Sequence, residues 1–174
     1  CPPIGHKQIE GDYVESWQPT NIHEKLLKDA KNISKIITDD LGGYGIYGVE
    51  FFVLENEVIF SELSPRPHDT GMVTMYTQNL NEFDLHLRAM LGLPIPNILM
   101  LRKGYSIVIK TGNDFPKNSS YKINGVNKAL ELNNIDIRIF GKEKAWPGRR
   151  LGVILCSDKD NGEAAKRFIN VVKK

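Results

Sequence analysis

Two glutamates in a strand-rich segment are the first side chains whose types and spacing suit chemistry. Glu50 and Glu62 lie in two runs rich in Phe, Val, Ile and Tyr, residues 44–53 and 57–63, which predict a β-hairpin. An odd-numbered loop of residues 55–57 would set Glu50 directly opposite Glu62, with their Cβ atoms about 5 Å apart. A two-residue loop would instead put the two side chains on opposite faces.

This glutamate pair favours a cation if the hairpin closes in the first register. Two carboxylates at such a distance repel unless a proton or a cation lies between them. Mg²⁺ suits the pair because it takes oxygen ligands and keeps waters or phosphate oxygens in its remaining positions. The alternative is that Glu50 and Glu62 are solvated side chains on an exposed hairpin face.

A stiff polar loop follows the hairpin, with the sequence Ser-Pro-Arg-Pro-His-Asp-Thr-Gly at residues 64–71. The prolines on either side of Arg66 restrict its backbone, which reduces the entropy lost when the guanidinium is placed. Arg66 is suited to hold a phosphate or a carboxylate, and Asp69 to accept a hydrogen bond from a ligand amine or hydroxyl. Alternatively the loop is structural, with Arg66 paired to Asp69 and His68 in a polar niche of the core.

Three cations at one predicted turn form a third candidate site. Lys142, Arg149 and Arg150 lie between or beside the predicted strands 135–140 and 151–156. Cations crowded at one end of a hairpin repel one another unless they are solvated or neutralised, so a phosphate monoester is a natural partner. The alternative is a solvated basic turn that binds nothing.

A glycine-rich segment and several isolated residues support no further site. Residues 43–48 match G-x-G-x-x-G, but these glycines follow a predicted helix and open a strand, the reverse of a dinucleotide site. His6, His23 and His86 lack the spacing of metal ligands. Cys156 lies inside an apolar strand, so we expect its thiol to be inert.

The longest predicted element is a helix over residues 20–41. Its apolar residues recur at spacings of three and four, Asn21 can open a capping box with Glu24, and Gly42-Gly43 supply a stop. Ahead of this helix, residues 1–19 predict short strands and turns.

The rest of the chain predicts two shorter helices and a change of texture. Asn81 caps a predicted helix over 82–91, and an amphipathic helix is predicted over 162–172. A Pro-containing linker follows the first of these, and short strands separated by polar turns come after it. We therefore expect an α+β chain with a boundary near residue 96, dividing it into residues 1–96 and 97–174.

Composition limits the classes of partner. The 174 residues are 41% hydrophobic and 25% charged, and the net charge of +2 is too small to predict binding to nucleic acid or to a membrane surface. No apolar run approaches the roughly 20 residues that span a bilayer. Cys1 and Cys156 lie at opposite ends, which argues against a disulfide framework or a CxxC site. We expect a reducing compartment, the cytoplasm.

Three segments together resemble a known enzyme family. Gly-Val-Glu-Phe-Phe at 48–52, Phe-Ser-Glu-Leu-Ser-Pro-Arg-Pro-His-Asp-Thr-Gly at 60–71 and Gly-Arg-Arg-Leu-Gly-Val at 148–153 are similar to the ATP-grasp carboxylate-amine ligases of purine biosynthesis. Within that superfamily the chain looks most like the formate-dependent phosphoribosylglycinamide formyltransferases. The resemblance implies the C-terminal half of an ATP-grasp domain, residues 1–96, followed by a small β-rich C-terminal domain, residues 97–174.

The resemblance also implies a set of ligands. By position, Glu50 and Glu62 would bind Mg²⁺ that bridges the phosphates of ATP. Formate is the implied acid, activated as formyl phosphate, and a homodimer is the implied assembly. The residues implied to contact glycinamide ribonucleotide are Asp69, Lys142, Arg149 and Arg150. The loop residues that would support this site are Arg66, His68 and Thr70.

In that family a substrate domain and the first part of the ATP-grasp domain precede these motifs. We therefore expect this chain to be a C-terminal portion that does not turn over alone. Its opening, Cys-Pro-Pro-Ile-Gly, has neither an initiator Met nor a signal-peptide profile.

Three other functions compete with this one. Sister enzymes that carboxylate aminoimidazole ribonucleotide usually have Asn where this chain has Asp69. A non-catalytic module that binds a nucleotide or ribonucleotide is the second alternative. An RNA-binding module is the third, and the net charge of +2 disfavours it.

Overall fold

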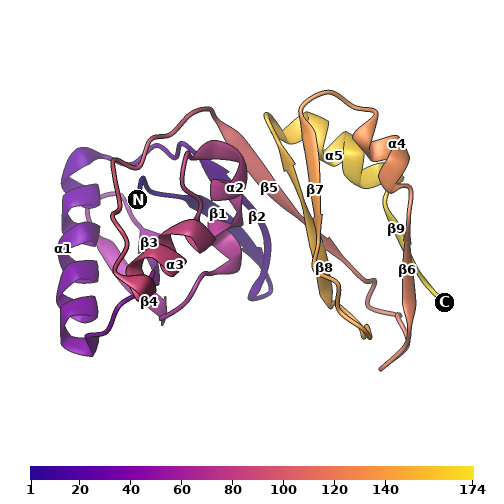
Figure 1. Cartoon of the computed structure of the whole chain (residues 1–174), viewed down its shortest axis with the longest axis horizontal. Helices are drawn as coiled ribbons and strands as arrows, with labels where there is room; N and C mark the ends of the chain where they lie inside the picture. The colour runs from indigo at the N-terminus through magenta and orange to yellow at the C-terminus, as the bar shows by residue number, and fades with distance from the viewer.

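A five-stranded antiparallel sheet lies at the centre of the computed structural model, which describes residues 1–174 (Figure 1). The strand order is β1-β2-β5-β8-β7. The strands are β1 (Gly5–Ile9), β2 (Asp12–Gln18), β5 (Gly104–Lys110), β7 (Ile135–Ile139) and β8 (Arg150–Cys156). The strands predicted before residue 19 and in the second half are confirmed. β5 and β8 are apolar along most of their length because both faces of the sheet are covered.

A separate hairpin and a long helix lie on one side of this sheet, at the left of Figure 1. The hairpin is β3 (Gly48–Val53) with β4 (Val58–Ser64), and the helix that contacts it is α1 (Glu24–Leu41). None of the helices combines the length and the apolar character needed to cross a membrane.

The first helix begins later than predicted. The predicted capping box at Asn21 is wrong, because His23 is the cap and its side chain accepts a hydrogen bond from the backbone of Lys25. The predicted stop is confirmed: Gly42 ends the helix with a φ of +67°, a conformation that glycine adopts without strain.

Short helical segments connect the hairpin to the second half of the chain. They are the 3₁₀ turn η1 (Asp69–Val73), α2 (Thr74–Thr77) and α3 (Glu82–Leu91). Asn81 caps α3 as predicted, since its side chain accepts from two backbone N–H groups while Asp84 accepts from the Asn81 N–H. Gly92 closes the helix with a φ of +66°.

The second half adds two helices and a small sheet. They are α4 (Val126–Leu130), α5 (Lys159–Phe168), and the strands β6 (Tyr121–Asn124) and β9 (Asn170–Lys173). The prediction of a last helix over 162–172 is wrong at both ends. The helix starts at Lys159 and stops at Phe168, because the β-branched residues after it pair with β6.

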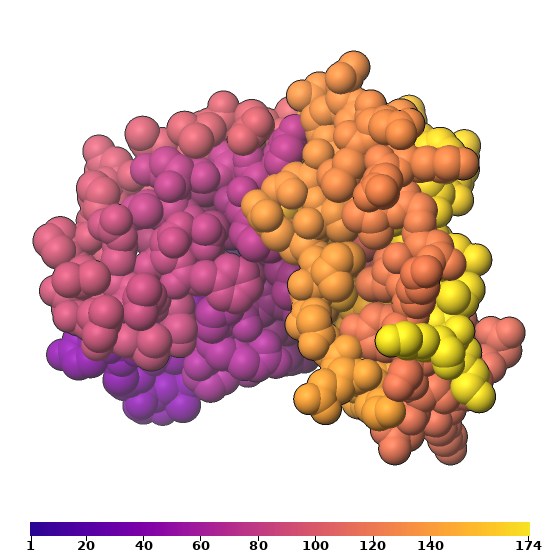
Figure 2. Space-filling model, turned by 45° about the vertical axis from the view of Figure 1, so that its right-hand side comes forward, coloured from indigo at the N-terminus to yellow at the C-terminus, as the bar shows by residue number.

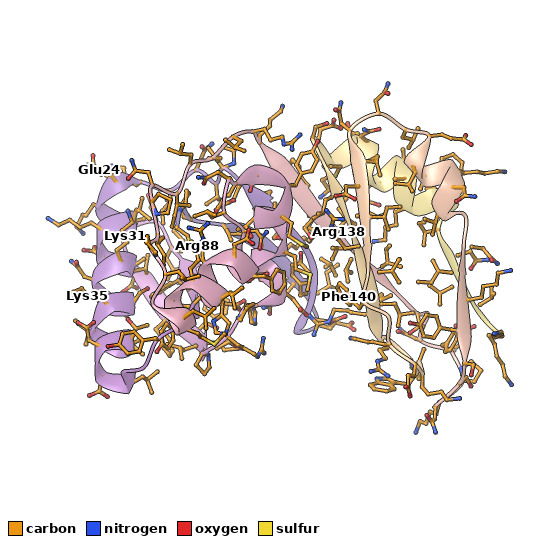
Figure 3. The ribbon with its side chains drawn as sticks, viewed as in Figure 1. Glu24, Lys31, Lys35, Arg88, Arg138 and Phe140 are labelled. Atoms are coloured by element: carbon orange, nitrogen blue, oxygen red, sulfur yellow. The ribbon has the colours of Figure 1, made fainter.

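The core has one layer on each face of the central sheet. Helices α4 and α5 cover one face, around Ile107, Ile154 and Ala165. On the other face Tyr76 packs with Val153 and Leu155, and Phe140 packs against this cluster between the two halves (Figure 3). The segment from η1 to α2 is thus held on strands of the second half.

The two halves share the sheet and do not separate at a free linker. Strand β2 pairs with β5 across the predicted boundary, and the halves meet along a seam in Figure 2. The boundary at residue 96 therefore stays a prediction, while the α+β architecture is confirmed.

Candidate functional site

The β3–β4 hairpin sets Glu50 directly opposite Glu62, which is one of the two arrangements that the sequence left open. The loop is not the odd-numbered one that would give this pairing directly: Val53 pairs with Val58, so residues 54–57 form a four-residue loop. The register then shifts by one residue between Glu50 and Phe51, a β-bulge that restores the pairing of the two glutamates.

The two carboxylates differ in exposure and meet at one histidine. Glu50 is 7% exposed, whereas the Glu62 side chain is 56% exposed. His68 Nδ1 lies 3.2 Å from Glu50 Oε1, and His68 Nε2 lies 3.6 Å from Glu62 Oε1. Gln8 Nε2 donates to Glu50 Oε2 at 3.2 Å. His6 Nε2 is 3.6 Å from that oxygen, so the buried carboxylate is surrounded by polar groups.

One oxygen of this pair is left without a hydrogen bond. Glu50 Oε1 is buried and has no hydrogen-bond partner. His68 Nδ1, which lies 3.2 Å from it, is hydrogen-bonded to Thr70 Oγ1 at 3.0 Å. A buried acceptor in this condition costs about 1–3 kcal/mol. An oxygen-preferring divalent cation would satisfy it.

The chemistry of the pair fits Mg²⁺ better than a metal held by protein alone. No group of three or more His, Cys, Asp or Glu side chains is arranged to hold a metal ion. Mg²⁺ is commonly bound by one or two carboxylates, with waters and substrate phosphates completing its shell. Glu50 and Glu62 therefore suit a metal that arrives with a phosphate group.

The Pro-rich loop connects this pair to a second cluster. The alternative in which Arg66 pairs with Asp69 is wrong, because Arg66 is exposed and its Nη1 donates to the carbonyl of Pro67 at 2.9 Å. Asp69 instead pairs with Arg150. His68 contacts the glutamates and its neighbour Asp69 contacts the cations, so one short loop touches both clusters.

Asp69 belongs to a ring of four charged side chains, which are Asp12, Asp69, Lys110 and Arg150. Lys110 and Arg150 are directly opposite on β5 and β8, where the register again shifts by one residue. Lys110 Nζ lies 2.7 Å from Asp12 Oδ2, and Arg150 Nε lies 3.8 Å from Asp12 Oδ1. The two carboxylates offset the repulsion between the two cations.

Asp12 and Lys110 were missed by the sequence analysis. Asp12 follows the Glu10-Gly11 turn, where both residues have positive φ, and it pairs with a lysine 98 positions later. The turn could be anticipated from Gly11, but nothing local to either charge indicates its partner.

The other two predicted cations lie beside this ring. Lys142 Nζ donates to the carbonyl of Arg150 at 2.8 Å. Burial lowers the pKa of Lys142, and the nearby Arg149 lowers it further. The Arg149 guanidinium stacks 3.6 Å from the centre of the Trp146 ring, and its buried Nε has no hydrogen-bond partner.

The charges of this region suit an anionic ligand. Two of the four cations, Lys110 and Arg150, form ion pairs with Asp12 and Asp69. The other two, Lys142 and Arg149, form no ion pair, so two positive charges are left over. A phosphate monoester carries about −1.5 to −2 near neutral pH. The region can hold such a group while Asp69 accepts a hydrogen bond from an amine.

Comparison with known families places both halves of the chain. Residues 1–83 match the ATP-grasp domain, and residues 106–174 match the family described as PurT, C-terminal.

Similar curated proteins include formate-dependent phosphoribosylglycinamide formyltransferases. The chain is 50% identical, over 96% of its length, to the formate-dependent phosphoribosylglycinamide formyltransferase of Bacillus velezensis, and covers 43% of that protein. It is 56% identical, over 94% of its length, to the protein of the same name from Prochlorococcus marinus, covering 41%. The chain therefore spans less than half the length of these relatives.

Solved structures show the same fold. The structure of glycinamide-RNase-transformylase T from Mycobacterium tuberculosis superposes with a TM-score of 0.77 at 31% identity, covering 98% of this chain and 49% of that one. N5-carboxyaminoimidazole ribonucleotide synthetase from Thermotoga maritima gives a TM-score of 0.81 at 25% identity, covering 92% and 46%. The fold is common to both enzymes, and sequence identity favours the first.

Proposed function

The chain belongs to the ATP-grasp family and, in its second half, to the PurT C-terminal family, and from this we propose that it supplies the Mg²⁺ ligands and the ribonucleotide site of a formate-dependent phosphoribosylglycinamide formyltransferase. The substrates proposed are ATP, formate and glycinamide ribonucleotide. A formate oxygen attacks the γ-phosphorus of ATP and ADP leaves. The substrate amine then attacks the carbonyl carbon of formyl phosphate, loses a proton and expels phosphate.

The observation that carries this proposal is the meeting of two clusters at one loop. His68 contacts the Glu50–Glu62 pair, and the next residue, Asp69, pairs with Arg150. Consecutive Cα atoms are about 3.8 Å apart, so a phosphate at the first cluster and an amine at the second would lie close together. Proximity of this kind is what a two-step transfer through an acyl phosphate requires.

Each side chain then has a defined role. Glu50 and Glu62 hold Mg²⁺, which when bound neutralises charge on the phosphates of ATP. Asp69 orients the amine of the ribonucleotide. The phosphate of the ribonucleotide is bound by Lys142, Arg149 and Arg150, whose positive charge is concentrated near the start of β8. Arg66, His68 and Thr70 shape the loop between the clusters.

The relatives are more than twice as long as this chain, which covers 43% of the first of them. We propose that the adenine contacts are supplied by a region of those enzymes outside this chain, that the enzyme is a homodimer, and that it works in the cytoplasm. By itself, the chain is expected not to turn over.

The test is ADP release by the full-length product of the gene that encodes this chain, with Mg-ATP and glycinamide ribonucleotide. The arms are formate, bicarbonate and no added acid. Formate dependence supports the proposal. Release with bicarbonate and aminoimidazole ribonucleotide would assign the chain to the carboxylating enzymes, which share the fold. Ligand binding without release in any arm would favour a non-catalytic binding module.

A further inference from the structure

We propose that Glu82 is a positioning residue that fixes the loop of residues 68–71, so that His68 stays between the metal-binding glutamates and Asp69 stays against Arg150. The inference rests on the proposed function for its consequence, but not for its geometry. None of the motifs that indicate the family contains Glu82, which lies eleven residues after Gly71.

The first observation is a hydrogen bond from the loop to a buried carboxylate. Glu82 opens α3 and is only 3% exposed. Its Oε2 accepts from the backbone N–H of His68 at 2.8 Å. A side chain of α3 thus accepts the backbone hydrogen bond of His68, whose ring contacts both Glu50 and Glu62. Charge-assisted bonds of this kind are stronger than neutral ones.

The second observation is a link from the same residue to the far end of the loop. The backbone N–H of Glu82 donates to Thr74 Oγ1 at 2.9 Å, and that hydroxyl donates to the carbonyl of Gly71 at 2.6 Å. The N–H of Gly71 in turn donates to the carbonyl of His68 at 2.8 Å. The start of α3 therefore holds both ends of the turn that carries Asp69.

The third observation is the close approach of the carboxylate to the loop backbone. A Cβ added to Gly71 would lie 2.2 Å from Glu82 Oε2, so no other residue fits at this position without displacing the carboxylate. The loop and Glu82 are packed as one unit. A shift of Glu82 would move the backbone on both sides of Asp69.

The energetic cost of Glu82 argues against a role in stability alone. Its Oε1 is buried without a hydrogen-bond partner. The pKa of Glu82 is raised to about 7, chiefly by burial and also by Asp69, against the opposing effects of the His68 hydrogen bond and of Arg66. A carboxylate in such a place destabilises the fold and is typical of functional regions. In either protonation state Oε2 still accepts from His68.

The experiment uses the full-length enzyme with Glu82→Ala, Glu82→Gln and Thr74→Val. The control is Glu131→Ala, at an exposed glutamate that caps the end of α4 and whose side chain forms no hydrogen bond or ion pair. For each variant, kcat and the KM for glycinamide ribonucleotide are measured, together with amide hydrogen exchange of residues 66–75 and of β8. Glutamine keeps an oxygen that accepts from His68, whereas alanine removes it.

We expect Glu82→Ala to lower kcat/KM by roughly 10- to 100-fold, because displacement of a site residue by about 1 Å has effects of this size. Exchange should accelerate at residues 66–75 and not in β8. Glu82→Gln should recover most of the loss, Thr74→Val should show a smaller change of the same kind, and Glu131→Ala should match the wild type.

Two results would overturn the inference. One is wild-type kinetics and wild-type loop exchange in Glu82→Ala. The other is Glu82→Gln behaving like Glu82→Ala, which would assign the effect to charge and not to the hydrogen bond. If Glu82→Ala unfolds, amide exchange rises throughout β8 as well. The inference is then tested by the kinetics and loop exchange of Glu82→Gln and Thr74→Val. Absence of formate-dependent release by the wild type would reject the proposed function alone, since loop exchange still tests the geometry.

Discussion

The strand pairs β3–β4 and β5–β8 differ in how the repulsion between two like charges is offset. Each brings two like charges directly opposite, Glu50 with Glu62 in the first and Lys110 with Arg150 in the second. In both, a one-residue shift of register occurs at that point. Like charges directly across a sheet destabilise it, so each pair needs compensation.

Compensation comes from the protein in only one of the two pairs. Asp12 and Asp69 lie against the cations of β5 and β8, whereas the glutamate pair forms no ion pair with a Lys or Arg. Its polar neighbours are His6, Gln8, Ser64 and His68. Glu50 Oε1 is left without a hydrogen bond. The first pair is therefore suited to take a cation from solution, and the second is preorganised before any ligand binds.

The largest effect that would test this contrast is on Glu50. In the full-length enzyme, Glu50→Gln should lower formate-dependent kcat/KM by roughly 10²- to 10³-fold, since a ligand to the proposed metal is lost. In EDTA the same variant should be no less stable than the wild type, because an unsatisfied charge is removed. Glu57→Gln, in the exposed loop of the same hairpin, is the control. A lower stability of Glu50→Gln than of the wild type in EDTA would contradict the interpretation that the charges of the glutamate pair are uncompensated.

The preorganised pair should behave differently. Arg150→Ala and Asp69→Ala should each raise the KM for glycinamide ribonucleotide by roughly 10- to 100-fold, and a double-mutant cycle on unfolding should show coupling of about 1–2 kcal/mol. The matched control is the exposed pair of Arg138 with Asp136 on β7, at 2.7 Å (Figure 3). Such a surface pair should couple by about 0–1 kcal/mol. Equal coupling in the two cycles would remove the distinction.

Glu82 is hydrogen-bonded to the loop that joins the two pairs, and its burial leads us to expect that stability depends on pH. Its pKa in the folded chain is raised to about 7 from 4.5. As pH rises from 4.5 to 7 the unfolded chain releases this proton first, so stability falls across that window and the loss is complete above it.

The Glu82→Gln variant lacks the titrating carboxyl group at this position. In urea unfolding at pH 8 it should therefore be more stable than the wild type by an amount of the order of 2 kcal/mol, and at pH 4 the gain should vanish. The groups that face Glu82 are Asp69 and Arg66, with the His68 N–H bonded to it. A gain independent of pH would assign the effect to packing.

The smallest effect concerns Asp12, a second carboxylate near Arg150. Because Asp12 is about one-third exposed and 3.8 Å from Arg150 Nε, Asp12→Asn should raise the ribonucleotide KM only about two- to fivefold. The change should diminish as salt is raised. An effect as large as that of Arg150→Ala would make Asp12 a direct ligand.

Local signals in the sequence were sufficient for most elements. The ends of α3 were predicted correctly because Asn81 and Gly92 act on the backbone within a few residues of themselves. The end of α5 was wrong because residues 170–173 pair with β6, some fifty positions earlier, and no local periodicity records that pairing. Helix caps are local interactions, and strand partners are not.

The sequence alone determined which side chains are available, the resemblance to ATP-grasp ligases, and the α+β class. It left open whether Glu50 lies opposite Glu62 or on the other face of the hairpin. Only the tertiary structure decided that a bulge produces this pairing, that Asp69 pairs with Arg150 81 positions away, and that Asp12, Lys110 and Glu82 belong to the same region. Register shifts and long-range ion pairs depend on the closure of the whole sheet, which no short segment specifies.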